Sequence, residues 1–143
     1  MPLELTNPLG NKYLSTRYDS DNQWVYNDWI GYQTFDSVFD GAEACLQLLQ
    51  KHSCSYLLND NRRVLGRWDH SMLWVLTDWV PRAIEVGLTH FAHVVQPDTM
   101  AMLSAEALTR GVGKGLQVVL FDDMEKAKAW LHEAQHTSPG KGL

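Results

Sequence analysis

The stretch TFDSVFDGAEACLQLLQKHSCSYLLNDN at residues 34–61 decides the fold. Its apolar residues first recur at helical spacing, with Thr34 as a capping residue and a predicted end near His52. The short apolar run Tyr56-Leu57-Leu58 follows and is closed by the polar residues Asn59-Asp60-Asn61. Such runs are typical of strands buried in a parallel sheet. This stretch therefore predicts one helix followed by one buried strand of an α/β protein.

Similar patterns continue on both sides of this stretch. Toward the N-terminus, two runs rich in Tyr, Trp, Val and Ile flank the turn Asp19-Ser20-Asp21-Asn22, which predicts an antiparallel hairpin. Toward the C-terminus, predicted helices begin near Asp69, Pro97 and Asp122, and Pro81 predicts a kink in the first of these. The predicted strands are Tyr13–Tyr18, Gln23–Gly31, Tyr56–Leu58, Phe91–Val95 and Leu116–Phe121.

The predicted order of elements is β-β-α-β-α-β-α-β-α. Three strand–helix–strand connections after one hairpin require a mostly parallel sheet. We therefore expect an α/β fold with a mostly parallel five-stranded sheet, one antiparallel N-terminal hairpin strand, and helices packed on the sheet. The length of 143 residues fits one domain, predicted at 13–135 between an extended arm at 1–12 and a flexible tail at 136–143.

Composition and charge restrict the class of function. The net charge of −5 disfavours a nucleic-acid partner, because phosphate binding needs clustered Lys and Arg. The sequence has neither a secretory signal at its start nor an apolar run of the ~18 residues that span a bilayer. The two cysteines, Cys45 and Cys54, form no CxxC motif. These features predict a cytoplasmic protein without stable membrane insertion.

Three sequence stretches and the order of the elements resemble a known family. The stretches are Asn22-Gln23-Trp24-Val25-Tyr26 with Asp28-Trp29-Ile30-Gly31, then Leu57-Leu58-Asn59-Asp60, and Asp78-Trp79-Val80-Pro81-Arg82-Ala83. From about Tyr13 to about Gln135, the chain looks like a STAS-type domain of the bacterial SpoIIAA-like (STAS/CRAL-TRIO-like) family. The resemblance implies a regulatory module that binds other proteins rather than an enzyme.

The resemblance also implies a phosphorylation site after the central strand, but this chain lacks the residue pair that forms it. Anti-sigma-factor antagonists with this fold carry an Asp-Ser pair after the central strand, and that Ser is phosphorylated. Here Asp60 is followed by Asn61, and the nearest serine is Ser71 in the first turn of the next predicted helix. We therefore expect that Ser71 is not an efficient phosphorylation switch, although a helix N-terminus favours a phosphate.

The residues after the central strand form the candidate ligand site. Asp60, Arg62 and Arg63 lie at the carboxyl end of a parallel strand, where α/β sheets usually bind ligands, and Trp68 follows them. The two arginines could bind a carboxylate or a phosphate. The alternative is a solvated loop whose ion pairs contribute little.

Metal and cofactor sites are not predicted. His132 and His136 lie one helical turn apart, a spacing that can ligate a metal, but the sequence offers no third ligand. The glycine-rich residues 111–115 follow a predicted helix and precede a strand, which is the wrong order for a phosphate loop. No nucleophile is paired with a placed histidine in the sequence, so neither a catalytic set nor a cofactor is expected.

The chain is rich in tryptophan, with six in total. Trp74 falls off the predicted core face of the second helix, and an aromatic residue in that position indicates an interface. We therefore predict a homodimer that buries Trp74, and a non-catalytic module that binds a protein partner. The alternative is a small carrier or sensor of an apolar or anionic, lipid-like ligand, which a pocket lined by Trp68, Trp74 and Trp79 would favour.

Overall fold

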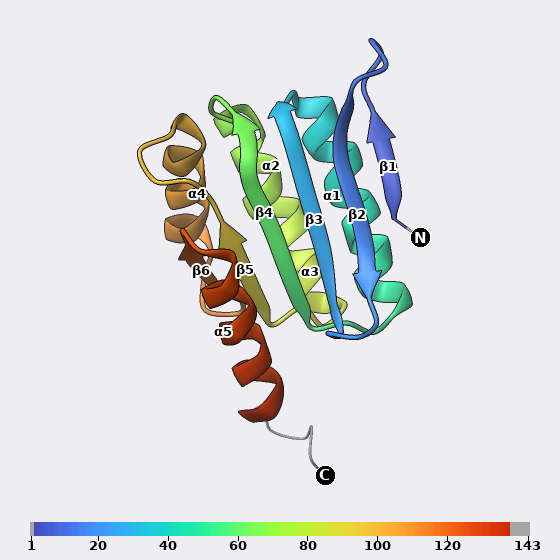
Figure 1. Ribbon diagram of the computed structural model, residues 1–143, viewed down its shortest axis with the longest axis vertical. Helices are drawn as coiled ribbons and strands as arrows, with labels where there is room; N and C mark the ends of the chain where they lie inside the picture. Colours follow the sequence, from blue (N-terminus) through green and yellow to red (C-terminus); the bar gives the residue numbers. More distant parts are fainter. Residues whose placement is uncertain (1, 138–143) are drawn as a thin grey trace.

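The computed structural model describes residues 2–137 and shows a single twisted sheet covered by helices on both faces (Figure 1). The strands are β1 (Leu3–Thr6), β2 (Lys12–Asp19), β3 (Trp24–Tyr32), β4 (Tyr56–Leu65), β5 (His90–Val94) and β6 (Gln117–Phe121). The helices are α1 (Phe35–Lys51), α2 (Met72–Trp74), α3 (Val80–Glu85), α4 (Met100–Gly111) and α5 (Met124–Thr137).

The six strands lie in the sheet in the same order as in the chain. β1, β2 and β3 pair antiparallel, and β3, β4, β5 and β6 pair parallel. The predicted α/β class, the antiparallel hairpin and the central, parallel position of Tyr56–Leu58 are confirmed. The predicted number of five strands is wrong, because Leu3–Thr6 of the predicted arm adds a sixth strand along β2.

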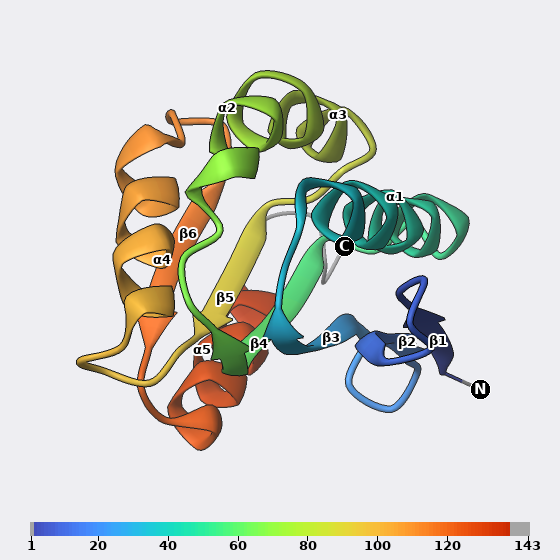
Figure 2. The same ribbon diagram turned by 90° about the horizontal axis from the view of Figure 1, so that it is seen from above.

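The order of the strands decides where the helices lie. Each of the three parallel connections advances the sheet in the same direction, and right-handed crossovers then place all connecting helices on one face. Accordingly, α1, the α2–α3 helix and α4 cover one face (Figure 2). α5 follows the last strand and covers the opposite face, where it packs on β4, β5 and β6.

Two element boundaries differ from the predicted ones. β4 continues for seven residues beyond Leu58, through a segment that its polar sequence predicted to be a loop. This segment is nevertheless extended, because it pairs with β3 as far as Tyr32 and Leu65. The predicted tail begins too early, because His136 and Thr137 complete α5. The rest of that tail, 138–143, lies outside the described residues.

The second helix is irregular along its whole length. It begins with a 3-10 turn at Asp69–Ser71, and a π turn at Val75–Trp79 separates α2 from α3. Pro81 cannot donate a backbone hydrogen bond, so the helix restarts at Val80 with Pro81 in its first turn. The predicted interruption is therefore present, and it takes the form of a π turn, a feature frequent at functional sites.

The apolar core has two parts because the sheet is covered on both faces. The larger part lies between the sheet and α1–α4, and the smaller lies under α5 around Trp24, Tyr56 and Leu131. Among residues 2–137, the helices lack the length and apolar character needed to cross a membrane.

Candidate functional site

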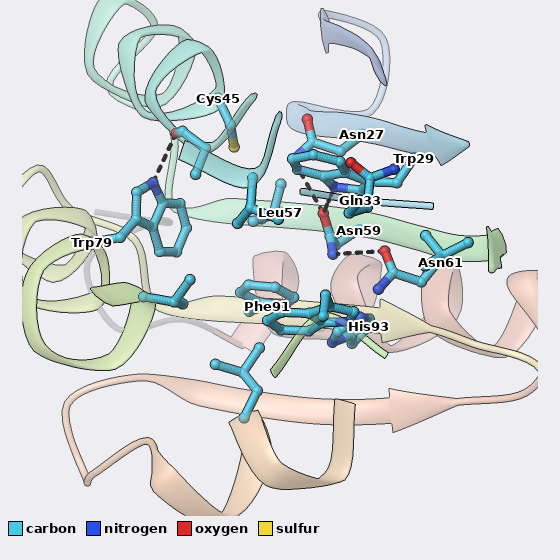
Figure 3. A pocket seen from close by; sticks show the side chains of 16 residues that line it. Asn27, Trp29, Gln33, Cys45, Leu57, Asn59, Asn61, Trp79, Phe91 and His93 are labelled. Carbon is cyan, nitrogen blue, oxygen red and sulfur yellow. Dashed lines mark hydrogen bonds between the residues drawn. The ribbon is translucent and has the colours of Figure 1, made fainter. Parts of the chain in front are cut away.

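A cavity of about 70 Å³ lies inside the larger core, between the sheet and the helices above it (Figure 3). All of its lining residues are buried, and none of them is an Asp, Glu, Lys or Arg. The strands contribute Asn27, Trp29, Leu57, Asn59, Asn61, Val64, Phe91 and His93. The helices and loops contribute Gln33, Val38, Ala42, Cys45, Trp68, Val75, Trp79 and Leu108.

A row of polar side chains crosses the sheet beneath this cavity. Thr16, Asn27, Asn59 and His93 occupy matching positions on four neighbouring strands, so the strand register alone brings them side by side. Thr16 Oγ1 donates to Asn27 Oδ1 at 2.5 Å, and Asn27 Nδ2 donates to Asn59 Oδ1 at 3.2 Å. All four residues are buried. The hydrogen-bonded part of the row ends at Asn59, next to His93.

A β-bulge extends the cavity wall toward the carboxyl end of β4. The register between β3 and β4 shifts between Asp28 and Ile30, so β4 carries an extra residue there. In a regular strand, residues three apart point to opposite faces, yet Asn61 and Val64 both line the cavity. Asn61 shares the face of Asn59 by ordinary alternation, and the bulge thus adds Val64 to the cavity wall. Asn61 Oδ1 accepts a long bond of 3.4 Å from Asn59 Nδ2.

His93 is the most unusual residue of the cavity. Its side chain is fully buried, and within residues 2–137 no hydrogen-bond partner reaches either ring nitrogen. Burial lowers the pKa of His93 to about 4, against a weaker opposing effect of Asp60. The imidazole is therefore neutral at physiological pH, with one N–H donor and one acceptor nitrogen. Buried polar groups are normally satisfied, so an exception in a cavity wall indicates a ligand or water.

The tryptophans of the cavity differ in how their indole N–H groups are bonded. Trp29 Nε1 donates to Asn59 Oδ1 at 2.9 Å, and Trp79 Nε1 donates to the Ala42 carbonyl at 2.8 Å. Trp68 Nε1 is buried and has no acceptor within the described part of the chain. The rings of Trp68 and His93 lie 6.4 Å apart, so the two unpaired groups belong to the same region of the cavity.

Cys45 lines the cavity but is not suited to act as a nucleophile. Burial raises the pKa of its thiol to about 12, so the reactive thiolate does not form at neutral pH. The low pKa of His93 likewise makes it a weak base. The chemistry of these side chains favours reversible binding over covalent catalysis.

The four residues of the predicted ligand site are divided between the two faces of the sheet. Trp68 reaches the cavity, whereas Asp60 and Arg62 form a two-point ion pair on the α5 side, at 3.0 Å (Nε to Oδ1) and 2.9 Å (Nη2 to Oδ2). Arg63 pairs with Asp28 instead. Alternation along β4 places Asp60 and Arg62 opposite Asn59 and Asn61, whereas Trp68 lies beyond the end of the strand.

A groove of about 240 Å³ lies on the α5 side of the sheet, next to this ion pair. Its three cationic side chains are Arg17, Arg62 and Lys128. Each of these cations lies within 4.0 Å of a carboxylate, from Asp19, Asp60 and Glu125 respectively. The positive charge of the groove is therefore largely compensated, which disfavours an anion there.

Ser71 is completely buried, and its Oγ lies 2.9 Å from His70 Nδ1. A kinase could reach this hydroxyl only after local unfolding of the turn at Asp69–Ser71. The structure thus adds a physical reason for the expectation that Ser71 is not an efficient switch.

His132 makes contacts that differ from those of a metal ligand. Its Nε2 lies 2.9 Å from Asn22 Oδ1, and its ring packs against Trp24 at 4.8 Å. No third ligand accompanies it, because residues 2–137 hold no group of three or more His, Cys, Asp or Glu placed to bind a metal. His132 therefore joins α5 to the β2–β3 turn, and His136 lies exposed one helical turn further on.

Trp74 is half-buried rather than freely exposed. Its ring lies 4.8 Å from that of Phe39 and 6.3 Å from that of Phe35, both on α1. Leu73 beside it is 76% exposed, so an apolar surface remains where α1 meets α2. The homodimer expected from Trp74 stays a prediction.

His93, Asn59, Asn61 and Trp29 were missed as site residues by the sequence analysis. The polar character of Asn59 and Asn61 predicted the end of the strand, although their spacing of two residues indicates that both side chains lie on the same face of a strand. No signal within a single segment identifies His93, because its role depends on the register of four strands.

No protein-family model, curated protein or solved structure matches this chain. The STAS-like resemblance therefore stays a prediction, and the candidate function is derived from the cavity itself.

Proposed function

We propose that this protein is a non-catalytic binding module whose cavity takes up a small, uncharged molecule. The observation that carries this proposal is His93, a buried and neutral imidazole in the cavity wall whose two nitrogens have no partner among residues 2–137. An unsatisfied buried polar group costs about 1–3 kcal/mol, and a bound molecule that supplies the missing hydrogen bonds recovers this free energy.

The cavity wall determines the charge of the ligand. None of the cavity residues is an Asp, Glu, Lys or Arg, and the nearby carboxylate of Asp60 is engaged by Arg62 and Tyr26. Transfer of a charged molecule from water into such surroundings is strongly unfavourable without a compensating charge. A neutral molecule with one polar end and one apolar end matches a wall of amides, imidazole, aromatic rings and aliphatic side chains.

The volume determines the size of the ligand. A cavity of about 70 Å³ is well below the ~300–1,000 Å³ that drug-sized ligands occupy. It is also below the ~150 Å³ of an engineered cavity that holds benzene. A cavity of this size thus favours a molecule of a few non-hydrogen atoms, and disfavours a lipid.

A regulatory, protein-binding role is the second candidate, supported by the STAS-like resemblance and by the apolar surface at Phe35, Phe39, Leu73 and Trp74. Phe35, Phe39 and Leu73 are exposed and Trp74 is half-buried, and such a cluster of apolar side chains is typical of docking surfaces. Light scattering on wild type and Trp74→Ala tests this candidate. A wild-type protein that stays monomeric at high micromolar concentration would rule out the homodimer.

Protein-observed NMR tests the ligand-binding proposal directly. We expect that neutral molecules of up to five or so non-hydrogen atoms, added at millimolar concentration, shift the indole N–H signal of Trp68. Val64→Phe fills the cavity and should abolish these shifts, whereas Val119→Phe, the same change on β6 away from the cavity, should preserve them. Shifts that persist unchanged in folded Val64→Phe would show that the cavity is not the binding site.

A further inference from the structure

The hydrogen bonds of the cavity wall leave a defined set of groups unpaired. Two of the three cavity tryptophans donate their indole N–H to another residue, and Trp68 has no acceptor in the part of the chain that the structure describes. His93 adds one N–H donor and one acceptor nitrogen. The two ring nitrogens of an imidazole point away from each other, so a small molecule can reach only one of them. A complementary molecule must therefore accept two hydrogen bonds, and a donor on it can bond to Asn61 Oδ1, which accepts a single long bond of 3.4 Å within the described residues.

Few uncharged groups meet this requirement on a small frame. A carbonyl oxygen has two lone pairs and can accept from two donors, and an amide adds an N–H next to it. A ketone or aldehyde lacks the donor, a hydrocarbon lacks both functions, and a carboxylate brings a charge that this wall does not compensate. The amide is thus the best match among simple functional groups.

The apolar part of the wall explains why water alone is a poor match. A buried water needs two to four polar partners. Beyond His93, Trp68, the asparagines and Gln33, the cavity is walled by Val38, Leu57, Phe91 and Leu108 and by other apolar side chains. Apolar substituents of a ligand can fill this part of the cavity, whereas a water there would lack partners.

We infer that the cavity recognises an uncharged carboxamide or lactam group, with Trp68 Nε1 and His93 as the recognition pair. This inference rests on the proposed function and specifies its ligand class. The carbonyl oxygen accepts from the indole of Trp68 and the N–H of His93, and the substituents of the amide lie against the aromatic and aliphatic wall.

A set of matched probes tests the ligand class. Acetamide, acetone, acetate and isobutene share one Y-shaped frame and differ only in charge and hydrogen bonding. We expect acetamide to bind most tightly, in the millimolar range typical of so few atoms, and acetate and isobutene at least tenfold more weakly. NMR titration that follows the indole signals and the His93 ring nitrogens measures all four affinities.

Substitutions with matched controls test the recognition pair. His93→Phe and Trp68→Phe should each weaken acetamide binding about tenfold and leave isobutene binding unchanged or tighter. His90→Phe, on the same strand but facing α5, and Trp130→Phe, on α5 and away from the cavity, should leave acetamide affinity within about twofold of wild type.

The possible outcomes separate this inference from the proposed function. Equal affinity for acetamide and isobutene, tight binding of acetate, or acetamide affinity unaffected by His93→Phe would overturn the amide inference and leave ligand binding in place. A second outcome would overturn both the amide inference and the proposed function. In that outcome, neither the four probes nor the wider set of neutral molecules bind, and a high-resolution crystal structure shows only ordered water at His93 and Trp68.

Discussion

Buried polar groups on the two faces of β4 differ in whether their hydrogen bonds are satisfied. On the α5 side, the Asp60 carboxylate is nearly inaccessible yet fully engaged, since it accepts from the Tyr26 hydroxyl at 2.8 Å and from the Arg62 side chain and backbone N–H. On the other side, the row from Thr16 to His93 ends in an imidazole with no partner within residues 2–137. The comparison separates polar groups that stabilise the fold from those that are available to a ligand.

The largest expected effect is a loss of stability between pH 6.5 and pH 4. The unfolded chain protonates His93 near its ordinary pKa of about 6.5, whereas the folded protein keeps it neutral until about pH 4. The free energy of unfolding should therefore fall by about 3 kcal/mol across this pH window. Below pH 4, His93 is protonated in both states and should cause no further change.

Urea denaturation at a series of pH values measures this effect. His93→Phe should lose most of the dependence, and His90→Phe serves as the control on the same strand. An equally steep dependence in His93→Phe would mean that other groups cause it.

Removal of the satisfied carboxylate gives the next largest effect. Asp60→Ala leaves Arg62 and the Tyr26 hydroxyl without their acceptor. We expect the free energy of unfolding to fall by about 2–3 kcal/mol, and not by more, because Arg62 is partly exposed to solvent. Asp28→Ala removes the more exposed pair with Arg63 and should cost under about 1 kcal/mol.

Asp60 and His93 also differ in the pH range over which their contributions to stability are lost. Despite burial, its hydrogen bonds with Arg62 and Tyr26 hold the pKa of Asp60 below its ordinary value. Its contribution is therefore fully present above the ordinary pKa of about 3.8 and is lost as the pH falls through the lower folded value. A smaller effect of Asp60→Ala than of Asp28→Ala would contradict the contrast between the two faces.

On the cavity side, the removal of a polar group should stabilise the protein. His93→Phe replaces an unsatisfied imidazole with an apolar ring of similar shape, and we expect a gain of about 1–2 kcal/mol at pH 7. Chemical denaturation in the absence of added ligand measures it. A marked destabilisation would show that His93 is satisfied in solution, which would weaken its assignment as a ligand contact.

The smallest effect is expected from three matched tryptophan substitutions. Trp79→Phe leaves the Ala42 carbonyl without its donor, whereas Trp68→Phe removes an N–H that has no acceptor among the described residues. Trp79→Phe should therefore lower the free energy of unfolding by about 1–2 kcal/mol more than Trp68→Phe. Trp29→Phe should resemble Trp79→Phe, because Asn59 loses a donor. Thermal denaturation of the three variants ranks them, and equal losses at all three positions would refute the distinction.

Much of the fold could be predicted from local patterns. The apolar run Tyr56–Leu58 and the alternating helices establish the parallel part of the sheet, and the Asp19–Asn22 turn establishes the hairpin. β1 escaped prediction because its four residues are too few to show a period, and the strand depends on pairing with β2. β4 was predicted too short because its second half is polar.

The candidate site could be predicted only in part, because it depends on register. Trp68 was the one residue of the predicted site that reaches the cavity. Asp60 and Arg62 were correctly placed together, but the pair satisfies itself on the opposite face. Asn27, Asn59 and His93 lie on separate segments, and single-sequence patterns carry no information about which residues of those strands align.

The order of the strands also has a consequence for how the chain acquires its structure. Every strand pairs only with strands adjacent to it in the chain, so the pairing can proceed in one direction along the sheet. During synthesis, the segment through β4 can form the antiparallel hairpin, α1 and the polar row as far as Asn59 before β5 leaves the ribosome. His93 then joins a nearly complete wall, and α5 covers the second face last.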